Sequence, residues 1–210
     1  MRLEILFIVS LTGALILVPF HFWSVEHRRL DARFGSEKGQ KIGKVLGIVS
    51  GWGYFLFLFG IWLSPQAIFV VPLLDDIPVL TLESSISVSL GDLILGTPFL
   101  FLGIWFGIKG VRDLGLEVSE THRAKSVVTT GIYSKVRHPQ YLGAIFSHIG
   151  ISLLLSAFYS LLVTPVLILR DFIVSRKEEQ QMELEFGEEY AMYKREVPML
   201  IPRVRVSQKR

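Results

Sequence analysis

Long apolar blocks, separated by polar connections, constrain the fold of this chain more than any other feature of its sequence. Half of its 210 residues are hydrophobic. Residues 3–23, 42–63 and 90–108 each form a block of about the length that one transmembrane helix needs. Residues 141–174 are too long for one helix, and we divide them into two short spans. The pattern predicts an all-α fold, a polytopic integral membrane bundle of about five transmembrane helices.

The first block raises the alternative of a cleaved secretory signal peptide. Its apolar core is long, however, and no cleavage pattern of small residues follows before the polar stretch EHRRLDARF at residues 26–34. We therefore expect this block to be retained as the first span.

Positive charge alternates between the connections. Arginine and lysine are frequent between the first two blocks, in residues 109–140 and after residue 174, whereas residues 64–89 contain neither. Because such residues gather in cytoplasmic loops, we predict a multi-pass protein with its amino terminus outside and its carboxyl terminus in the cytoplasm. The outer stretch FVVPLLDDIPVL, residues 69–80, is expected to lie along the membrane interface or to cap the bundle.

The last two spans are predicted to form a C-terminal helical hairpin. A turn at residues 156–160 would give two antiparallel arms, each roughly 25 Å long at 1.5 Å per residue. Pro139 suits the first turn of the first arm, and Pro165 is expected to kink the second arm. Because the second arm returns to the starting face, residues 137–139 and 176–179 are expected to meet at one cytoplasmic rim.

A helix with one apolar stripe is predicted beyond the hairpin, ended by Pro198. The apolar residues of the stripe recur at steps of three or four: Met182, Phe186, Tyr190, Tyr193 and Val197. This spacing predicts a cytoplasmic amphipathic helix that packs on the bundle or lies in the interface.

The polar residues at the rim have ordinary explanations when they are taken singly. An arginine at a helix end commonly anchors the topology, a tyrosine there commonly joins the aromatic belt, and a charge run is usually a solvated face. Here they converge beside a polar loop, residues 110–140, that is longer than a connection needs. Their convergence indicates a functional site.

Composition excludes several chemistries. The chain contains no cysteine, which excludes a disulfide framework, a thiolate metal site and a cysteine nucleophile. Its five histidines show no metal-ligand spacing, so we expect no metal. The sequence has neither a GxxxxGK[ST] loop nor a GxGxxG turn after a strand, and no basic helix interleaved with aromatics suggests nucleic acid.

Two motifs give the chain a family resemblance. Residues 131–143 have the pattern G-x-Y-x-x-x-R-H-P-x-Y-x-G, and residues 178–198 have E-E-x(6)-F-G-x-x-Y-x-x-Y-x-x-x-V-P. With both motifs, residues 125–202 resemble the isoprenylcysteine carboxyl methyltransferase family and its phospholipid methyltransferase relatives. We therefore divide the chain into three N-terminal transmembrane helices, residues 1–110, and a catalytic region, residues 111–210, with the cofactor loop, the hairpin and the C-terminal helix.

The resemblance implies a membrane-embedded methyltransferase that uses S-adenosyl-L-methionine, and it assigns site residues by motif. Cofactor-binding residues are expected in the loop and at the start of the hairpin: Lys125, Ser126, Val127, Val128, Tyr133, His138, Pro139, Gln140 and Tyr141. One glutamate of the pair Glu178 and Glu179 would complete this pocket, and Arg176 would orient the acceptor. The catalytic candidates are thus Arg176, Glu178 and Glu179.

The methyl acceptor stays open at this stage. We predict carboxyl O-methylation of an isoprenylcysteine-like or other lipophilic acceptor that enters sideways from the bilayer, because an ionised carboxylate needs no base. A phospholipid, amine or thiol acceptor would lose a proton, and Glu178, Glu179 or His138 would then be the candidate base. A non-catalytic membrane subunit or carrier of the same fold is a further alternative.

Overall fold

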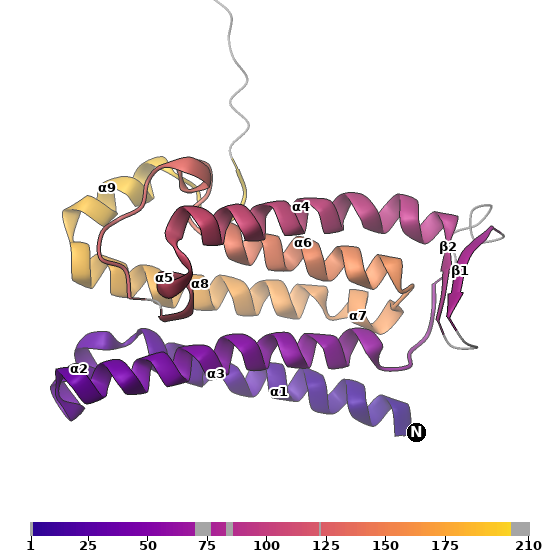
Figure 1. The fold of residues 1–210 in the computed structure, drawn as a ribbon, viewed down its shortest axis with the longest axis horizontal. Coiled ribbons are helices and arrows are strands. Elements are labelled where there is room, and N and C mark those ends of the chain that lie inside the picture. Colours follow the sequence, from indigo (N-terminus) through magenta and orange to yellow (C-terminus); the bar gives the residue numbers. More distant parts are fainter. Residues whose placement is uncertain (1, 70–76, 83–85, 122, 203–210) are drawn as a thin grey trace, which may run out of the picture.

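The computed structural model of the protein describes residues 2–69, 77–82, 86–121 and 123–202 (Figure 1). Its elements follow one another in this order: α1 (Arg2–Val25), α2 (His27–Phe34), α3 (Ser36–Leu63), β1 (Pro78–Leu82), β2 (Ile86–Ser89), α4 (Leu90–Leu114), α5 (Leu116–Thr121), the 3₁₀-helix Gly131–Ser134, α6 (Pro139–Leu154), α7 (Phe158–Leu162), α8 (Thr164–Phe186) and α9 (Glu188–Glu196). The fold is mostly helical, as predicted.

The long helices form two groups that lie side by side (Figure 1). In one group α1 packs along α3, and in the other α4 packs along α6, with α8 in contact with both α6 and α1. Leu167 of α8 packs into a buried apolar cluster that includes Leu58 and Ile61 of α3 and Ala14 of α1. This cluster joins the two groups.

Three helices are long and apolar enough to cross a membrane: α1 over Ile5–Val25, α3 over Ser36–Leu63 and α4 over Leu90–Leu114. They confirm the first three predicted blocks. Their outward surface is apolar, since Leu56 is 69% exposed, Phe101 67% and Ile8 59%. Apolar surface on this scale marks contact with lipid or with another protein, and three span-length helices favour lipid.

The chain after α4 folds back on itself through α6, the short helix α7 and α8 (Figure 1). Ser156, in the turn after α6, has a positive φ of 48°, and its hydroxyl donates to Asp92 at the start of α4. Pro139 occupies the first turn of α6, as predicted. The predicted kink at Pro165 is wrong: α8 begins at Thr164, so Pro165 lies in its first turn, where its missing N–H costs no hydrogen bond.

The predicted helix beyond the hairpin is interrupted. Gly187 has φ 56°, in the left-handed region that glycine tolerates best, and it separates α8 from α9. The apolar stripe nevertheless remains one cluster, because Tyr190, Tyr193 and Val197 pack together with Met182, Phe186 and Val127. The stripe therefore folds α9 back over the loop between α5 and α6.

A small β-hairpin lies at the other end of the bundle, and it was not predicted. β1 and β2 pair antiparallel, with Leu80 opposite Val88 and Leu82 opposite Ile86. The predicted placement of residues 69–80 along the interface falls mainly on residues 70–76, which lie outside the described residues.

Candidate active site

A cavity of about 410 Å³ opens where the two helix groups meet, at the end of the bundle that carries α5 and α9. Apolar side chains of α3 and α4 line much of it, among them Trp52, Phe55, Val111 and Leu114. Polar residues from several parts of the chain also line it, among them His21, Ser119, Tyr133, Arg137, His138, Gln140, Tyr141, Arg170, Glu178 and Gln181. The cavity thus combines a wall suited to a lipophilic group with a cluster of polar groups.

The structure brings most of the predicted site residues to this cavity. Eight of them line it: Ser126, Val127, Val128, Tyr133, His138, Gln140, Tyr141 and Glu178. Pro139 and Glu179 are buried beside the lining, whereas Lys125 lines a neighbouring polar cavity with Arg123 and Asp31. Arg176 is exposed on α8, with its guanidinium 5.9 Å from the ring centroid of Phe172, and it is not part of the lining.

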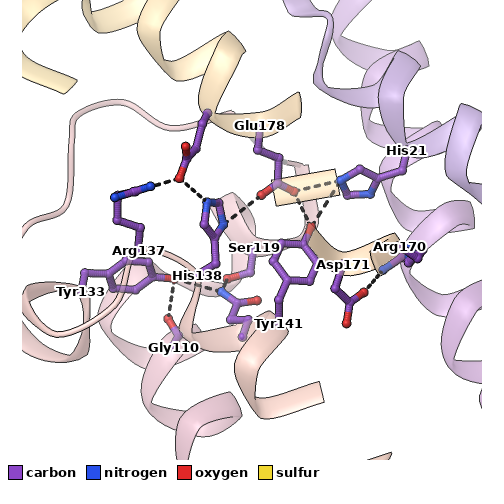
Figure 2. Close-up of polar contacts among 12 residues, drawn as sticks. His21, Gly110, Ser119, Tyr133, Arg137, His138, Tyr141, Arg170, Asp171 and Glu178 are labelled. Atoms are coloured by element: carbon purple, nitrogen blue, oxygen red, sulfur yellow. Dashed lines mark hydrogen bonds and ion pairs between the residues drawn. The ribbon is translucent and has the colours of Figure 1, made fainter. Parts of the chain in front are cut away.

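His138 lies between Glu178, labelled in Figure 2, and Glu179. Its Nδ1 is 3.5 Å from Oε2 of Glu178, and its Nε2 is 3.2 Å from Oε1 of Glu179. Burial opposes protonation of the ring, but hydrogen bonds to Glu178 and Glu179 outweigh it and raise the pKa of His138. Both ring nitrogens can then donate, one to each carboxylate.

Glu179 holds the segment before α6 against α8 and α9. Its carboxylate is fully buried and accepts from Nε of Arg137 at 2.7 Å, while Nζ of Lys194 lies at 3.3 Å. Burial favours the neutral acid, but the hydrogen bonds from His138 and Arg137 outweigh it and lower the pKa of Glu179 to about 2. Arg137 also donates to the backbone carbonyls of Lys194 and Val197, so this buried ion pair organises the wall of the site.

Glu178, one residue earlier, faces the cavity instead. Its Oε1 accepts a hydrogen bond from the hydroxyl of Tyr141, and it lies 2.8 Å from Nε2 of His21. Figure 2 shows these three side chains, which come from α8, α6 and α1, converging on one point. A carboxylate held in this way can bind a cationic group.

A second polar group sits on the neighbouring turns of α8. Nη1 of Arg170 donates to Oδ1 of Asp171 at 2.7 Å, and the guanidinium lies 3.8 Å from the ring centroid of Tyr54. Both charged residues are almost fully buried, and Arg170 lines the cavity. No motif of the sequence marks Arg170 and Asp171, although a charged pair inside an apolar span is costly and indicates a functional site.

A chain of neutral groups runs along the other side of the cavity. Nε2 of Gln140 donates to Oγ of Ser119 at 2.9 Å and to the hydroxyl of Tyr133 at 3.3 Å. Burial raises the pKa of Tyr133, so its hydroxyl stays neutral. The hydroxyl of Tyr193 donates to the carbonyl of Tyr133 at 2.8 Å and thereby ties α9 to this chain.

Fold and site together define a helical membrane protein with a half-apolar, half-polar cavity at one end of its bundle. Comparison with known proteins relates this arrangement to methyltransferases: residues 92–189, from the start of α4 to the start of α9, match the family described as phospholipid methyltransferase.

Several similar proteins carry the same name. Protein-S-isoprenylcysteine O-methyltransferase of Schizosaccharomyces pombe is 36% identical over 111 residues, which cover 50% of this chain and 47% of the yeast protein. The Mus musculus and Homo sapiens proteins of that name are 38% and 37% identical over 88 and 93 residues, covering 41% of this chain and 30% of theirs. The predicted resemblance is thus confirmed, although the chain spans less than half the length of the curated relatives it matches.

Proposed function

We propose that this chain is an integral membrane methyltransferase that uses S-adenosyl-L-methionine and methylates a lipophilic acceptor. The observation that carries the proposal is the position of Glu178. Its carboxylate lines the cavity beside His138 and Tyr141, within the region that is similar to methyltransferases. The apolar wall opposite gives a lipophilic acceptor a place beside a polar cofactor.

The chemistry of the cavity suits this cofactor. Glu178 supplies a carboxylate for a cationic amino group or sulfonium, and Gln140 and Tyr133 supply amide and hydroxyl groups for a nucleoside. Val127 and Val128 supply apolar surface for the nucleobase of that nucleoside. When it is bound, S-adenosyl-L-methionine provides a methyl group on a positively charged sulfur.

The remaining motif residues take supporting roles in the proposal. Ser126 and Tyr141 line the cavity, while Pro139 starts α6 and thereby aims His138. We assign Glu179 to holding Arg137 and His138 in place rather than to contact with the cofactor. Lys125 faces the neighbouring polar cavity, at the edge of the site.

We propose carboxyl O-methylation of an isoprenylcysteine-like acceptor as the reaction. Arg170, rather than the exposed Arg176, would orient the acceptor carboxylate, since a guanidinium matches that group and Arg170 lines the cavity. An in-line displacement between aligned groups needs little further catalysis, because orientation alone contributes up to about 7–11 kcal/mol.

A membrane arrangement accompanies this function. We propose that α6 and the first part of α8 also lie in the bilayer, giving about five spans, with the amino terminus outside and the cavity at the cytoplasmic face. At 16 residues, α6 is roughly 24 Å long, so it would be a short span around which the bilayer thins. Residues 1–110 would form the lipid-facing spans and residues 111–210 the catalytic region.

Phospholipid or amine methylation is the second candidate, and the description of the matching family favours it. A protonated acceptor would need a base, and Glu178, a carboxylate of the cavity lining that contacts His138 and Tyr141, is placed to accept the proton. A carrier of the same fold without activity would not bind the cofactor and would form no methylated product.

Cofactor binding is the first test. Purified protein in detergent is titrated with labelled S-adenosyl-L-methionine, and Glu178→Gln is compared with Glu183→Gln, which removes a carboxylate of the same helix that pairs with Lys194 outside the cavity lining. We expect saturable binding, a loss of about tenfold or more in Glu178→Gln, and no change in Glu183→Gln. Absence of saturable binding by the intact protein would contradict the proposal.

The acceptor is then found by incubating the protein with lipid extracts and methyl-labelled cofactor. A carboxyl methyl ester releases labelled methanol in alkali, whereas N-methyl and S-methyl products keep the label. We expect methanol release, and we expect Arg170→Lys to lower the transfer rate with little change in cofactor affinity. Alkali-stable label would move the assignment to an amine or a thiol.

A further inference from the structure

His21 is the one polar residue of α1 in the cavity lining of the described chain, and it lies outside the region that is similar to methyltransferases. It is 3% exposed and sits one turn before the end of α1. An apolar residue would be the ordinary choice at this depth in a membrane-spanning helix. A buried histidine at this position therefore indicates a functional role.

The ring of His21 points at Glu178 (Figure 2). Nε2 of His21 is 2.8 Å from Oε1 of Glu178 and 3.3 Å from the hydroxyl of Tyr141, which donates to the same Oε1. The other oxygen, Oε2, has Nδ1 of His138 at 3.5 Å. Donors to the carboxylate thus come from α1 and from α6 with the residue before it.

Two donors on one oxygen fix the direction of the carboxylate. A glutamate side chain has three rotatable bonds, and ordering it costs conformational entropy on the order of 1–2 kcal/mol. If the hydrogen bonds have already ordered the side chain before a ligand binds, that cost does not reduce the affinity for the ligand. By ordering the Glu178 side chain in advance, His21 would raise the affinity of Glu178 for its ligand.

A simple tie between the end of α1 and α8 is the competing explanation, but the structure provides ties to α8 directly after α1, at Glu26 and at His27 of α2. Nζ of Lys177 lies 2.6 Å from Oε1 of Glu26, and Nδ1 of His27 lies 2.9 Å from Oε1 of Glu185. Neither Glu26 nor Lys177 lines the cavity. The rim thus has an ion pair for holding the helices together, one turn from His21.

We infer that His21 is a positioning residue, contributed by the N-terminal spans, that holds Glu178 in the orientation in which it binds the cationic part of the cofactor. The inference rests on the proposed function. It also gives α1 a part in the active site, so that the region similar to methyltransferases would not form a complete site by itself.

Three substitutions test the inference. His21→Leu removes the donor, His21→Asn keeps a polar group that is too short to reach Glu178, and His21→Gln restores an amide N–H near the position of Nε2. Glu26→Gln is the matched control, because it breaks the tie to Lys177 outside the cavity. Equilibrium binding of labelled S-adenosyl-L-methionine and initial rates against cofactor concentration are measured on purified protein, with melting midpoints as the check on folding.

We expect His21→Leu and His21→Asn to raise the Kd and the KM for the cofactor about 10- to 100-fold, since a hydrogen bond to a charged group contributes about 1.5–3 kcal/mol. The kcat at saturating cofactor should change less than the KM, His21→Gln should recover most of the affinity, and Glu26→Gln should bind normally. In a Glu178→Gln background, His21→Leu should cause little further loss, because its effect passes through Glu178.

Other outcomes overturn the inference. Unchanged cofactor affinity in folded His21→Leu or His21→Asn, no recovery in His21→Gln, or an equal loss in Glu26→Gln would each leave His21 as a structural tie. If His21→Leu does not fold, the comparison of His21→Asn with His21→Gln decides. Failure of the intact protein to bind the cofactor would instead reject the proposed function.

Discussion

Glu178 and Glu179 are neighbours in the chain, and helix geometry turns them about 100° apart. Glu178 therefore faces the cavity, while Glu179 faces the segment before α6 and the end of α9. The motif alone left open which of the two is functional. Their surroundings support the separate roles that we propose for them, Glu178 in binding and Glu179 in holding the wall of the site together.

Glu179→Gln is expected to destabilise the protein. Arg137 would keep its charge in a buried position without a carboxylate partner, and breaking a buried pair on one side costs about 3–5 kcal/mol. The free energy of unfolding in mixed detergent micelles measures this effect. Glu178→Gln serves as the comparison and should change stability far less while weakening cofactor binding.

The pKa values of Glu179 and His138 predict how the stability of the folded protein depends on pH. The pKa of Glu179 is about 2 in the folded protein against an ordinary value of 4.5. Its contribution is therefore present above pH 4.5 and is lost as the pH falls toward about 2. The pKa of His138 is raised above 6.5, so its contribution is present below that value and is lost at higher pH. Acid loss of equal size in Glu179→Gln would contradict this account.

At the scale of elements, α4 and α6 approach each other through glycines. A Cβ added at Gly143 would lie 2.7 Å from the backbone nitrogen of Gly107 and 2.8 Å from the carbonyl oxygen of Gly103. Backbone atoms cannot move aside as a flexible side chain can. Close contact between small residues is a common way for membrane helices to associate, and here it places Gln140 and Tyr141 next to the end of α4.

Gly143→Ala is expected to push α6 away from α4 and to cost about 1–3 kcal/mol, as overpacking does. Gly107→Ala is the matched control, because a Cβ there meets nothing within 4 Å. It should be neutral, or stabilising by up to about 1 kcal/mol through helix propensity. Melting midpoints of the two variants in detergent provide the measurement, and equal midpoints would mean that the glycine contact is unimportant.

The elements also show which features a sequence of this kind reveals. The apolar blocks predicted α1, α3 and α4, and Pro139 marked the start of α6, because length and backbone chemistry are local properties. The predicted kink at Pro165 was wrong, because the turn before it extends through α7 and Pro165 therefore lies at the start of α8. The apolar stripe predicts one continuous helix through Gly187, because the stripe does not reveal that the backbone has a positive φ there.

The candidate site was predictable only where it follows a motif. The residues of the RHPQY segment and Glu178 were found in this way, and most of them line the cavity. His21 and Arg170 were not found, because their significance depends on how α1 and α8 pack, which no local pattern records. The place of Arg176 beside the glutamates predicts a site residue, but helix periodicity turns its side chain away from the cavity and leaves it exposed.

At the scale of the whole molecule, the cavity exists because two groups of helices meet. One group supplies His21 and the apolar wall of α3, and the other supplies the polar residues of α6 and α8. Three helices of these groups are long and apolar enough to cross a membrane, so a lipophilic acceptor would reach the cavity from the bilayer and a polar cofactor from the side of α5 and α9. The position of that side relative to the membrane thus decides which compartment supplies the cofactor.

Because the chain contains no cysteine, single cysteines report this orientation without background. Thr129→Cys and Gln180→Cys place exposed thiols near the cavity, and Ala67→Cys places one near the opposite end. With a membrane-impermeant maleimide we expect labelling of Ala67→Cys in intact cells, and of the other two only after permeabilisation, as the positive-inside rule requires. Labelling of Thr129→Cys and Gln180→Cys from opposite sides would separate the loop from α8 and remove the shared cavity on which the proposed function depends.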